Sequence, residues 1–382
     1  MSILPQPDPY VAAGVDYRQL DGAKRLALSS ASPTSAWLEA QGARALDASR
    51  GEPAFVFTVG GLTLAFVMEG LGTKSMIARA HFASDAVDRF GDVAYDTVAA
   101  ILNDLTCVGA LPLVLNAYFA TGSSDWYADQ QRTRSLVEGW RRACDDATCT
   151  WGGGESPSLS GLVASEEIEL AGSAIGLVPA GRDPLLGQEL AAGDEIILVA
   201  SSGLHANGAS LARKVAEALP QGFSTLLPSG RAFGDALLEP SLLYVALVRA
   251  LLQDDHSVHY LSHISGHGLL KLMRPSKSFT YRIHTLPNVP EVLAFLSDRS
   301  GLDSASAFRT LNMGAGLAIY CAPGSGAAVV ATAEQLGYSA VQAGVVERGA
   351  RRVVLEPVDV VYASDELRLA PETGAAPPEG PT

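Results

Sequence analysis

Segments with a strand pattern alternate with segments with a helix pattern along the chain, and one stretch divides this series in two. The stretch, residues 180–193, is rich in glycine, proline and aspartate. Before it, β-rich runs at 55–59 and 62–68 precede an amphipathic helix expected at 92–109; after it, a strand expected at 194–201 opens a second alternating series. Such alternation predicts layered α/β structure, and the break predicts a domain boundary. We therefore expect an α/β (α+β) protein of two domains.

The expected domains cover residues 1–180 and 181–363. Residues 364–382 are acidic and rich in proline, glycine and alanine, which predicts a disordered tail. A chain of 382 residues with 48% hydrophobic and 18% charged residues has enough apolar surface for two well-buried cores. This composition excludes a disordered or coiled-coil protein.

The charge balance narrows the range of partners. The chain has 27 basic and 41 acidic residues, a net charge of −14, so binding to nucleic acid or to an anionic membrane is disfavoured. An anionic small substrate would need a local positive site or a bound cation. Four cysteines lack the paired spacing of a zinc ribbon or a disulfide framework. Together with a proline-rich start that does not resemble a signal peptide, they predict a cytoplasmic protein.

The helix expected at 92–109 carries a polar cluster opposite its apolar stripe. At 3.6 residues per turn, Asp96 and Asn103 point the same way, and Asp104 lies about 80° from Asp96 around the helix axis. Two carboxylates and an amide are oxygen ligands that suit magnesium. A solvated helix face is the commoner meaning of such a cluster taken alone.

The segment Glu69–Lys74 (EGLGTK) follows a strand and is too rich in glycine for a helix. Gly70 and Gly72 allow backbone N–H groups to approach an anion closely, Lys74 adds a positive charge, and Thr73 adds a hydroxyl. A carboxylate on a metal ion and a lysine on the phosphates is the usual arrangement around Mg-ATP. The P-loop spacing is absent, and a long turn with an exposed lysine explains the segment about equally well.

Three further glycine-rich segments could bind a ligand. Gly152–Ser156 would place Glu155 beside a ligand, although a flexible connector is slightly more plausible locally. Ser201–Gly208 joins a strand to a helix, so its N–H groups and hydroxyls could meet an anion, with His205 and Asn207 orienting or protonating a substrate. A well-capped helix start is the alternative. The loop His263–Gly268 has the same order of elements.

Taken in order, these segments resemble phosphoribosylformylglycinamidine cyclo-ligases, the AIR synthetase family of purine biosynthesis. The resemblance runs from about residue 10 to residue 355, and such a long collinear series is far more specific than any one motif. The segments that carry it are Tyr10–Asp16 (YVAAGVD), Glu69–Lys74 (EGLGTK), Asn103–Leu105, Gly109–Pro112, Tyr118–Gly122 (YFATG), Gly153–Glu155, Ala171–Gly172, Ser201–Lys214 (SSGLHANGASLARK), His263–Leu269 and Phe308–Gly316 (FRTLNMGAG).

The resemblance implies an ATP-dependent, Mg²⁺-requiring ligase that closes a ring by forming a C–N bond. In this chemistry ATP phosphorylates the formyl-amide oxygen of a phosphoribosyl substrate, formylglycinamidine ribonucleotide. The amidine nitrogen then displaces phosphate and aminoimidazole ribonucleotide forms. The resemblance also implies a homodimer in which the N-terminal domains share a barrel, with nucleotide in the interface clefts.

The resemblance also implies roles for individual residues. The expected metal ligands are Glu69, Asp96 and Asp104; the expected nucleotide contacts are Gly70, Gly72, Thr73, Lys74 and Asn103; the expected substrate contacts are Gly153, Gly154, Glu155, Ser202, His205 and Asn207; and the expected catalytic residues are Lys74, His205 and Glu155.

The chain departs from the family pattern at several positions, namely Val11, Glu69, Phe90, Ser158 and His267. These departures keep two other functions open. One is a superfamily relative that phosphorylates another small substrate, such as a thiamine-monophosphate kinase or a hydrogenase-maturation dehydratase. A selenophosphate synthetase is disfavoured because no cysteine precedes Cys107. The other is a binding or regulatory subunit with weakened catalysis.

Overall fold

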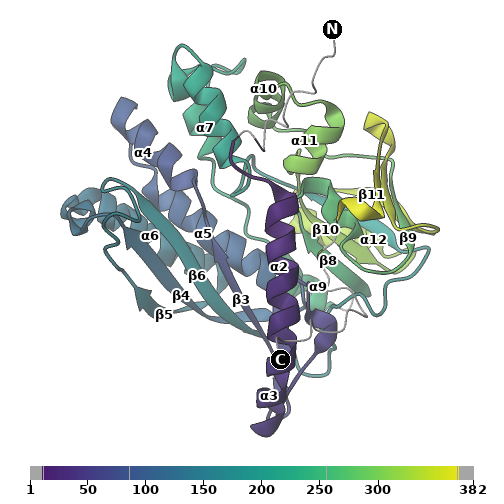
Figure 1. The fold of residues 1–382 in the computed structure, drawn as a ribbon. Coiled ribbons are helices and arrows are strands. Elements are labelled where there is room, and N and C mark those ends of the chain that lie inside the picture. The colour runs from purple at the N-terminus through teal and green to yellow at the C-terminus, as the bar shows by residue number, and fades with distance from the viewer. Residues whose placement is uncertain (1–10, 12, 86, 255, 368, 370–382) are drawn as a thin grey trace, which may run out of the picture.

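A computed structural model of the chain describes residues 11, 13–85, 87–254, 256–367 and 369 (Figure 1). Two sheets organise the fold. The first has six strands in the order β1-β2-β3-β6-β4-β5, and the second has seven in the order β13-β12-β9-β11-β7-β10-β8. Most neighbouring strands are antiparallel; the pairs β4–β5 and β9–β12 are parallel. The fold is therefore a mixed α/β arrangement around two sheets, as expected.

The described residues of the N-terminal half form the first sheet and five α-helices. The strands are β1 (Ala43–Ala45), β2 (Phe55–Val59), β3 (Leu62–Gly70), β4 (Leu111–Thr121), β5 (Thr150–Glu155) and β6 (Ile168–Leu177). The helices are α2 (Tyr17–Ala31), α3 (Ala36–Ala40), α4 (Lys74–Asp85), α5 (Phe90–Thr106) and α6 (Gln130–Ala147).

In the C-terminal half, the part of the chain that the structure describes forms the second sheet and six α-helices. The strands are β7 (Glu195–Ala200), β8 (Val258–His263), β9 (Phe279–Ile283), β10 (Ala315–Cys321), β11 (Ala340–Arg348), β12 (Arg352–Leu355) and β13 (Val360–Ala363). The helices are α7 (Ala209–Ala218), α8 (Phe233–Leu237), α9 (Val245–Gln253), α10 (Glu291–Ser300), α11 (Ser304–Thr310) and α12 (Gly326–Gln335).

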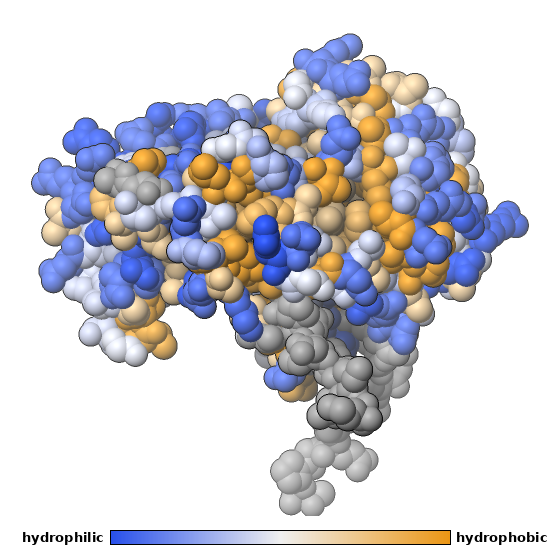
Figure 2. Space-filling view, turned by 90° about the horizontal axis from the view of Figure 1, so that it is seen from above, coloured by the Kyte–Doolittle hydropathy of each residue, from blue (hydrophilic) through white to orange (hydrophobic). Residues whose placement is uncertain are grey.

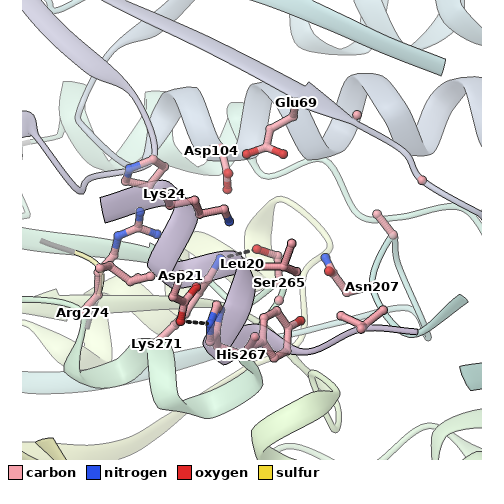
Figure 3. Close-up of a pocket in the computed structure, with 18 of the residues that line it drawn as sticks. Leu20, Asp21, Lys24, Glu69, Asp104, Asn207, Ser265, His267, Lys271 and Arg274 are labelled. Atoms are coloured by element: carbon pink, nitrogen blue, oxygen red, sulfur yellow. Dashed lines mark hydrogen bonds and ion pairs between the residues drawn. The ribbon is translucent and has the colours of Figure 1, made fainter. Parts of the chain in front are cut away.

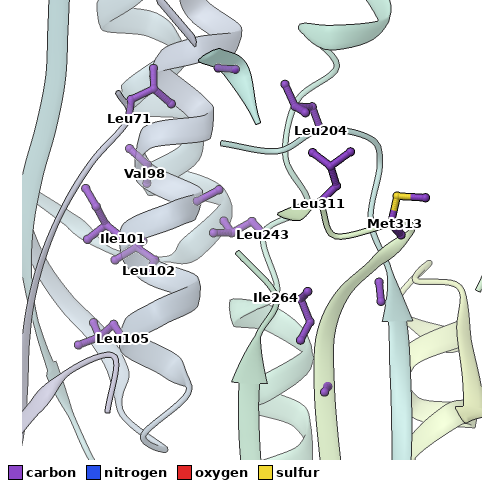
Figure 4. Packing of buried hydrophobic residues seen from close by; sticks show 14 of the residues in the cluster. Leu71, Val98, Ile101, Leu102, Leu105, Leu204, Leu243, Ile264, Leu311 and Met313 are labelled. Carbon is purple, nitrogen blue, oxygen red and sulfur yellow. The ribbon is translucent and has the colours of Figure 1, made fainter. Parts of the chain in front are cut away.

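Helix α5 is the core element of the N-terminal half and packs against β3 and β6. Its predicted apolar stripe is confirmed, because Val98, Ile101, Leu102 and Leu105 are all completely buried (Figure 4). The helix ends at Thr106, three residues earlier than predicted from the sequence. The turn that follows brings Gly109 to a positive φ of 76°, a conformation that favours glycine.

One prediction about an irregular segment was wrong. Residues 150–155 form the edge strand β5 rather than a loop, because these glycines pair in parallel with β4 through partners such as Asn116 and Gly153. The expected tail begins with ordered residues, since Ser364–Glu366 form a short 3₁₀ turn and Leu367 is completely buried. Residues 368 and 370–382 of the expected tail lie outside the described residues.

The first sheet is packed on one face only. In β3, Ala65 and Val67 are buried, while the alternate residues Phe66 and Met68 are 47% and 68% exposed. Phe66 belongs to an apolar row that crosses four strands on the outer face, made by Phe55, Phe66, Ile175 and Val114. We call this surface the open sheet face. Continuous apolar surface of this kind is typical of an interaction site.

The surface seen from above combines polar and apolar regions (Figure 2). On the face seen from above, hydrophilic residues cover much of the rim and hydrophobic residues gather toward the middle (Figure 2). Within the part of the chain that the structure describes, no helix combines the length and apolarity needed to cross a bilayer.

Candidate functional site

A cavity of about 710 Å³ lies between the two halves of the chain. Four segments form most of its walls (Figure 3). Helix α2 and the loop Glu69–Thr73 belong to the N-terminal half, and residues 206–210 and 265–274 belong to the C-terminal half. The two glycine-rich segments that the sequence singled out, Glu69–Lys74 and Ser201–Gly208, therefore contribute to opposite walls of one cavity.

An acidic pair, Glu69 and Asp104, faces this cavity. Glu69 stands near the end of β3, and Asp104 is in the last turn of α5. Desolvation raises the pKa of Glu69 to about 7, and the negative charge of Asp104 adds to the increase. Of the three expected metal ligands, the structure brings Glu69 and Asp104 to the same cavity.

Asp104 differs from Glu69 because it has a strong partner. Its Oδ1 lies 2.6 Å from Nδ1 of His263, at the end of β8. Burial acts to raise the pKa of Asp104, but the hydrogen bond and the charge of His263 outweigh it, so the pKa is lowered. Asp104 therefore remains a carboxylate at neutral pH, while Glu69 titrates there.

Three cationic side chains line the same cavity, and the sequence analysis assigned none of them. Lys24 comes from α2, and Lys271 and Arg274 follow the loop His263–Gly268. Lys271 donates a hydrogen bond to Ser265, and Arg274 donates to the carbonyl of Gly51 at 2.8 Å. The position of the loop after a strand was a usable signal for Lys271 and Arg274. Lys24 was missed because the sequence analysis predicted no helix over residues 17–31, which form α2.

Lys74 and Asp96 lie elsewhere, in an ion pair that is completely buried. The Lys74 Nζ atom is 2.5 Å from Oδ2 of Asp96 and donates a hydrogen bond of 2.8 Å to the carbonyl of His205. The other carboxylate oxygen of Asp96 accepts a hydrogen bond of 2.6 Å from the backbone N–H of Ser241. Neither side chain lines the cavity. This pair joins the N-terminal half to two loops of the C-terminal half.

Asn103 makes a similar connection between the halves. Its Nδ2 donates to the carbonyl of Leu242 at 2.9 Å, and its Oδ1 accepts from the N–H of Tyr244 at 2.8 Å. The polar face of α5 therefore divides into two parts. Asp96 and Asn103 bind the backbone just before α9, and Asp104 alone among the three faces the cavity.

His205 and Ser202 hold the loop between β7 and α7. His205 is buried and its φ is 58°, and its Nε2 accepts a hydrogen bond of 3.2 Å from the backbone N–H of Ser202. Burial, and then the charges of His263 and Lys74, lower its pKa well below the ordinary value, so His205 is neutral. Ser202 donates its hydroxyl to the carbonyl of Pro240 at 2.6 Å. Asn207, two residues beyond His205, does line the cavity.

The remaining predicted residues fall in two places. The Thr73 hydroxyl lies 3.0 Å from that of Ser210, so a hydrogen bond connects opposite walls of the cavity near Gly70 and Gly72. Gly153, Gly154 and Glu155 are exposed on the edge strand β5 and do not line the cavity. In register, Glu155 lies opposite Tyr118, which lies opposite Ala171, which lies opposite Gly70.

Sequence comparison matches the two parts of the chain to two family domains. Residues 51–178 match the family "AIR synthase related protein, N-terminal domain", and residues 191–355 match "AIR synthase related protein, C-terminal domain". The chain belongs to this family of AIR synthase related proteins.

Individual relatives carry a more specific name. A protein of Anaeromyxobacter sp. (strain Fw109-5) named phosphoribosylformylglycinamidine cyclo-ligase is 36% identical over 296 residues, which are 76% of this chain and 82% of that protein. A protein of the same name from Methanothermobacter thermautotrophicus is 31% identical and covers 72% of this chain and 77% of that protein. Among solved structures, hydrogenase maturation protein HypE in complex with ATP shares the fold, with a TM-score of 0.56 and 17% identity over 78% of this chain and 83% of that chain.

Proposed function

We propose that the chain is an ATP-dependent cyclo-ligase that converts formylglycinamidine ribonucleotide to aminoimidazole ribonucleotide. The observation that carries the proposal is the pair Glu69 and Asp104, which faces a cavity also lined by a glycine-rich loop and by lysines. This combination suits a nucleotide bound with a divalent cation. The names of the curated relatives support the reaction, and the ATP complex of HypE, which has the same fold, supports the nucleotide.

The acidic pair fits a magnesium ion that arrives with its nucleotide. Within the described residues, no group of three or more histidine, cysteine, aspartate or glutamate side chains is arranged to hold a metal ion. Mg²⁺ is commonly bound by only one or two carboxylates, and phosphate and water oxygens complete its coordination. Glu69 and Asp104 would hold the ion, whose charge would stabilise negative charge on the phosphates.

The other cavity residues would position the reactants. Backbone N–H groups of the loop Gly70–Thr73 would contact the nucleotide phosphates, and Asn207 would contact the phosphoribosyl substrate. The formyl-amide oxygen then takes the terminal phosphoryl group of ATP, and ADP leaves. The amidine nitrogen next attacks the formyl carbon that carries this phosphorylated oxygen, and phosphate is displaced. Lys74 and His205 act as positioning residues in this proposal, because a buried ion pair and a neutral histidine fix the loop before α7.

A homodimer would complete the assembly, and the open sheet face is the surface for it. Phe66 and Met68 are largely exposed there within a sheet whose other face is packed. A second copy of the sheet would bury this surface, as the shared barrel of the family implies. Glu155 lies on the same sheet, in register with Gly70 through Ala171 and Tyr118. It would act on substrate at the side that the second copy covers.

Substituting the open sheet face is expected to separate the copies. In Phe66→Glu the new charge cannot be buried against a second sheet, so light scattering after size exclusion should report a monomer where the wild type is a dimer. Leu336→Glu, at a residue 45% exposed in the C-terminal half, is the matched control and should remain dimeric. If the Phe66→Glu variant remained dimeric, the dimer interface would have to lie on another surface than the open sheet face.

The raised pKa of Glu69 predicts a pH dependence of cation binding. Below about pH 7 Glu69 is protonated and cannot ligate a metal ion, so the Mg²⁺ concentration needed for half-maximal ATP binding should rise as pH falls from 8 to 6. Isothermal titration of ATP at several Mg²⁺ concentrations and pH values measures this Mg²⁺ requirement. Glu69→Gln should bind Mg-ATP weakly with little pH dependence, and a wild-type pH dependence in that variant would contradict the assignment.

The reaction itself is tested with purified protein, ATP, Mg²⁺ and formylglycinamidine ribonucleotide. ADP release that depends on this substrate, together with purine-free growth of a host lacking the cyclo-ligase, supports the proposal. ADP release only with other small substrates would instead make the chain a phosphorylating relative. Nucleotide binding without turnover would make it a binding subunit.

The four cysteines, all free and buried, agree with a cytoplasmic location.

A further inference from the structure

Helix α2 turns one continuous stripe toward the cavity. The residues that line the cavity recur at helical spacing, from Tyr17 through Leu20, Asp21 and Lys24 to Leu28. Lys24 lies in the middle of this stripe and extends toward Asp104 in the close-up (Figure 3). Its side chain makes no hydrogen bond or ion pair within the described residues, and it is exposed to the cavity. It is therefore a cation available to a ligand.

Contacts near the start of α2 set the position of Lys24. The ring of Tyr17 stacks on His267 with centroids 3.9 Å apart, and Oδ2 of Asp21 lies 3.0 Å from Nε2 of the same histidine. His267 has a φ of 70° and belongs to the loop that leads to Lys271. One histidine thus connects the helix that carries Lys24 to the segment that carries Lys271.

Lys271 is the second cation of the cavity without a carboxylate partner at ion-pair distance in the described part of the chain. It is 7% exposed and donates to the hydroxyl of Ser265. Burial lowers the pKa of Lys271, and the negative charges of Asp104 and Glu69 offset part of that decrease. Arg274, in contrast, is held by Glu52 at 3.4 Å and by the carbonyl of Gly51. The unpaired positive charge therefore comes from Lys24 on α2 and Lys271 on the opposite domain.

We propose that Lys24 and Lys271 bind the terminal phosphates of the nucleotide from opposite walls of the cavity, in the role that the sequence had suggested for Lys74. The two lysines would contact phosphate oxygens, and the acidic pair would hold a divalent cation bound to the same phosphates. Such a set of charges suits a polyphosphate. This inference rests on the proposed nucleotide site. It goes further in two respects. It makes α2 a nucleotide-binding element, and it assigns the selectivity of the site for polyphosphates to Lys24 and Lys271.

The test compares ATP, ADP and AMP binding by isothermal titration in the full chain with Mg²⁺. Loss of one charged hydrogen bond predicts that Lys24→Met binds ATP about tenfold more weakly. The expected loss is smaller for ADP and absent for AMP. Lys24→Arg should retain most of the affinity. Arg25→Met removes a charge one residue along the same helix, at a position that does not line the cavity, and should leave all three affinities unchanged.

Lys24→Glu strengthens the test, because reversing an exposed charge leaves folding intact and should weaken ATP binding more than Lys24→Met does. ATP affinities equal to wild type in both variants would overturn the inference, as would equal losses for ATP and AMP. A wild type that binds ATP but does not act on formylglycinamidine ribonucleotide refutes the proposed reaction and leaves this inference standing. A wild type that binds no nucleotide refutes both.

Discussion

The variant Lys74→Met is expected to be about 3–5 kcal/mol less stable than the wild type. The reason is that Asp96 is completely buried and would lose the ammonium group 2.5 Å away, so the folded variant must either keep an unpaired buried carboxylate or protonate it. The carbonyl of His205 would lose its donor as well. Urea unfolding followed by tryptophan fluorescence measures the change in the free energy of unfolding.

Two further variants separate the buried pair from a general effect of losing a lysine. Adding Asp96→Asn to Lys74→Met removes the stranded charge and should restore part of the stability. Lys24→Met removes a cation without an ion-pair partner in the described residues and should change stability by no more than about 0.5 kcal/mol. If Lys74→Met costs less than about 1 kcal/mol, as exposed pairs do, the buried pair is not what joins the two halves.

The second large effect is expected for Asp104→Asn. The substitution keeps the shape of the side chain but removes the carboxylate of the acidic pair that is fully ionised at neutral pH, where Glu69 is only partly ionised. We expect substrate-dependent ADP release to fall on the order of 100-fold and the Mg²⁺ requirement for ATP binding to rise. A coupled ADP assay and a Mg²⁺ titration of ATP binding measure the two effects.

The matched control is Asp298→Asn, which makes the same chemical change at a side chain that is 78% exposed in the C-terminal half. It should retain wild-type turnover. Because Asp104 also contacts His263, a thermal melt of each variant checks that the fold persists. If folded Asp104→Asn showed unchanged Mg²⁺ dependence and unchanged ATP affinity, the assignment of Asp104 as a metal ligand would be wrong.

The sequence predicted the framework of the site better than its chemistry. The apolar stripe of α5 identifies a buried helix because hydrophobic spacing depends only on the helix itself. Its polar face does not have a unique meaning, since Asp96 and Asn103 bind backbone groups more than 135 residues away while Asp104 faces the cavity. No local pattern distinguishes a carboxylate that binds a cation from one that binds a distant N–H group.

Two other features escaped the sequence for different reasons. Helix α2 has cavity-facing residues of mixed polarity, among them Leu20 and Lys24, so its stripe does not stand out as hydrophobic. Strand β5 consists largely of glycine, which is depleted in strands, and its pairing with β4 brings together residues that are distant in sequence. Both are cases in which tertiary contacts outweigh local preference.

The hydrogen bonds of Asp96 and Asn103 with the segment before α9 have a consequence for how this protein can be divided. Separated from residues 241–244, the N-terminal half would carry polar side chains without their acceptors and donors in its main helix, and the C-terminal half would present bare amide groups. These hydrogen bonds make the two halves complementary to each other at this contact. Exchange of one half between distant relatives would require both surfaces to change together, so recombination should preserve the two halves as a single unit.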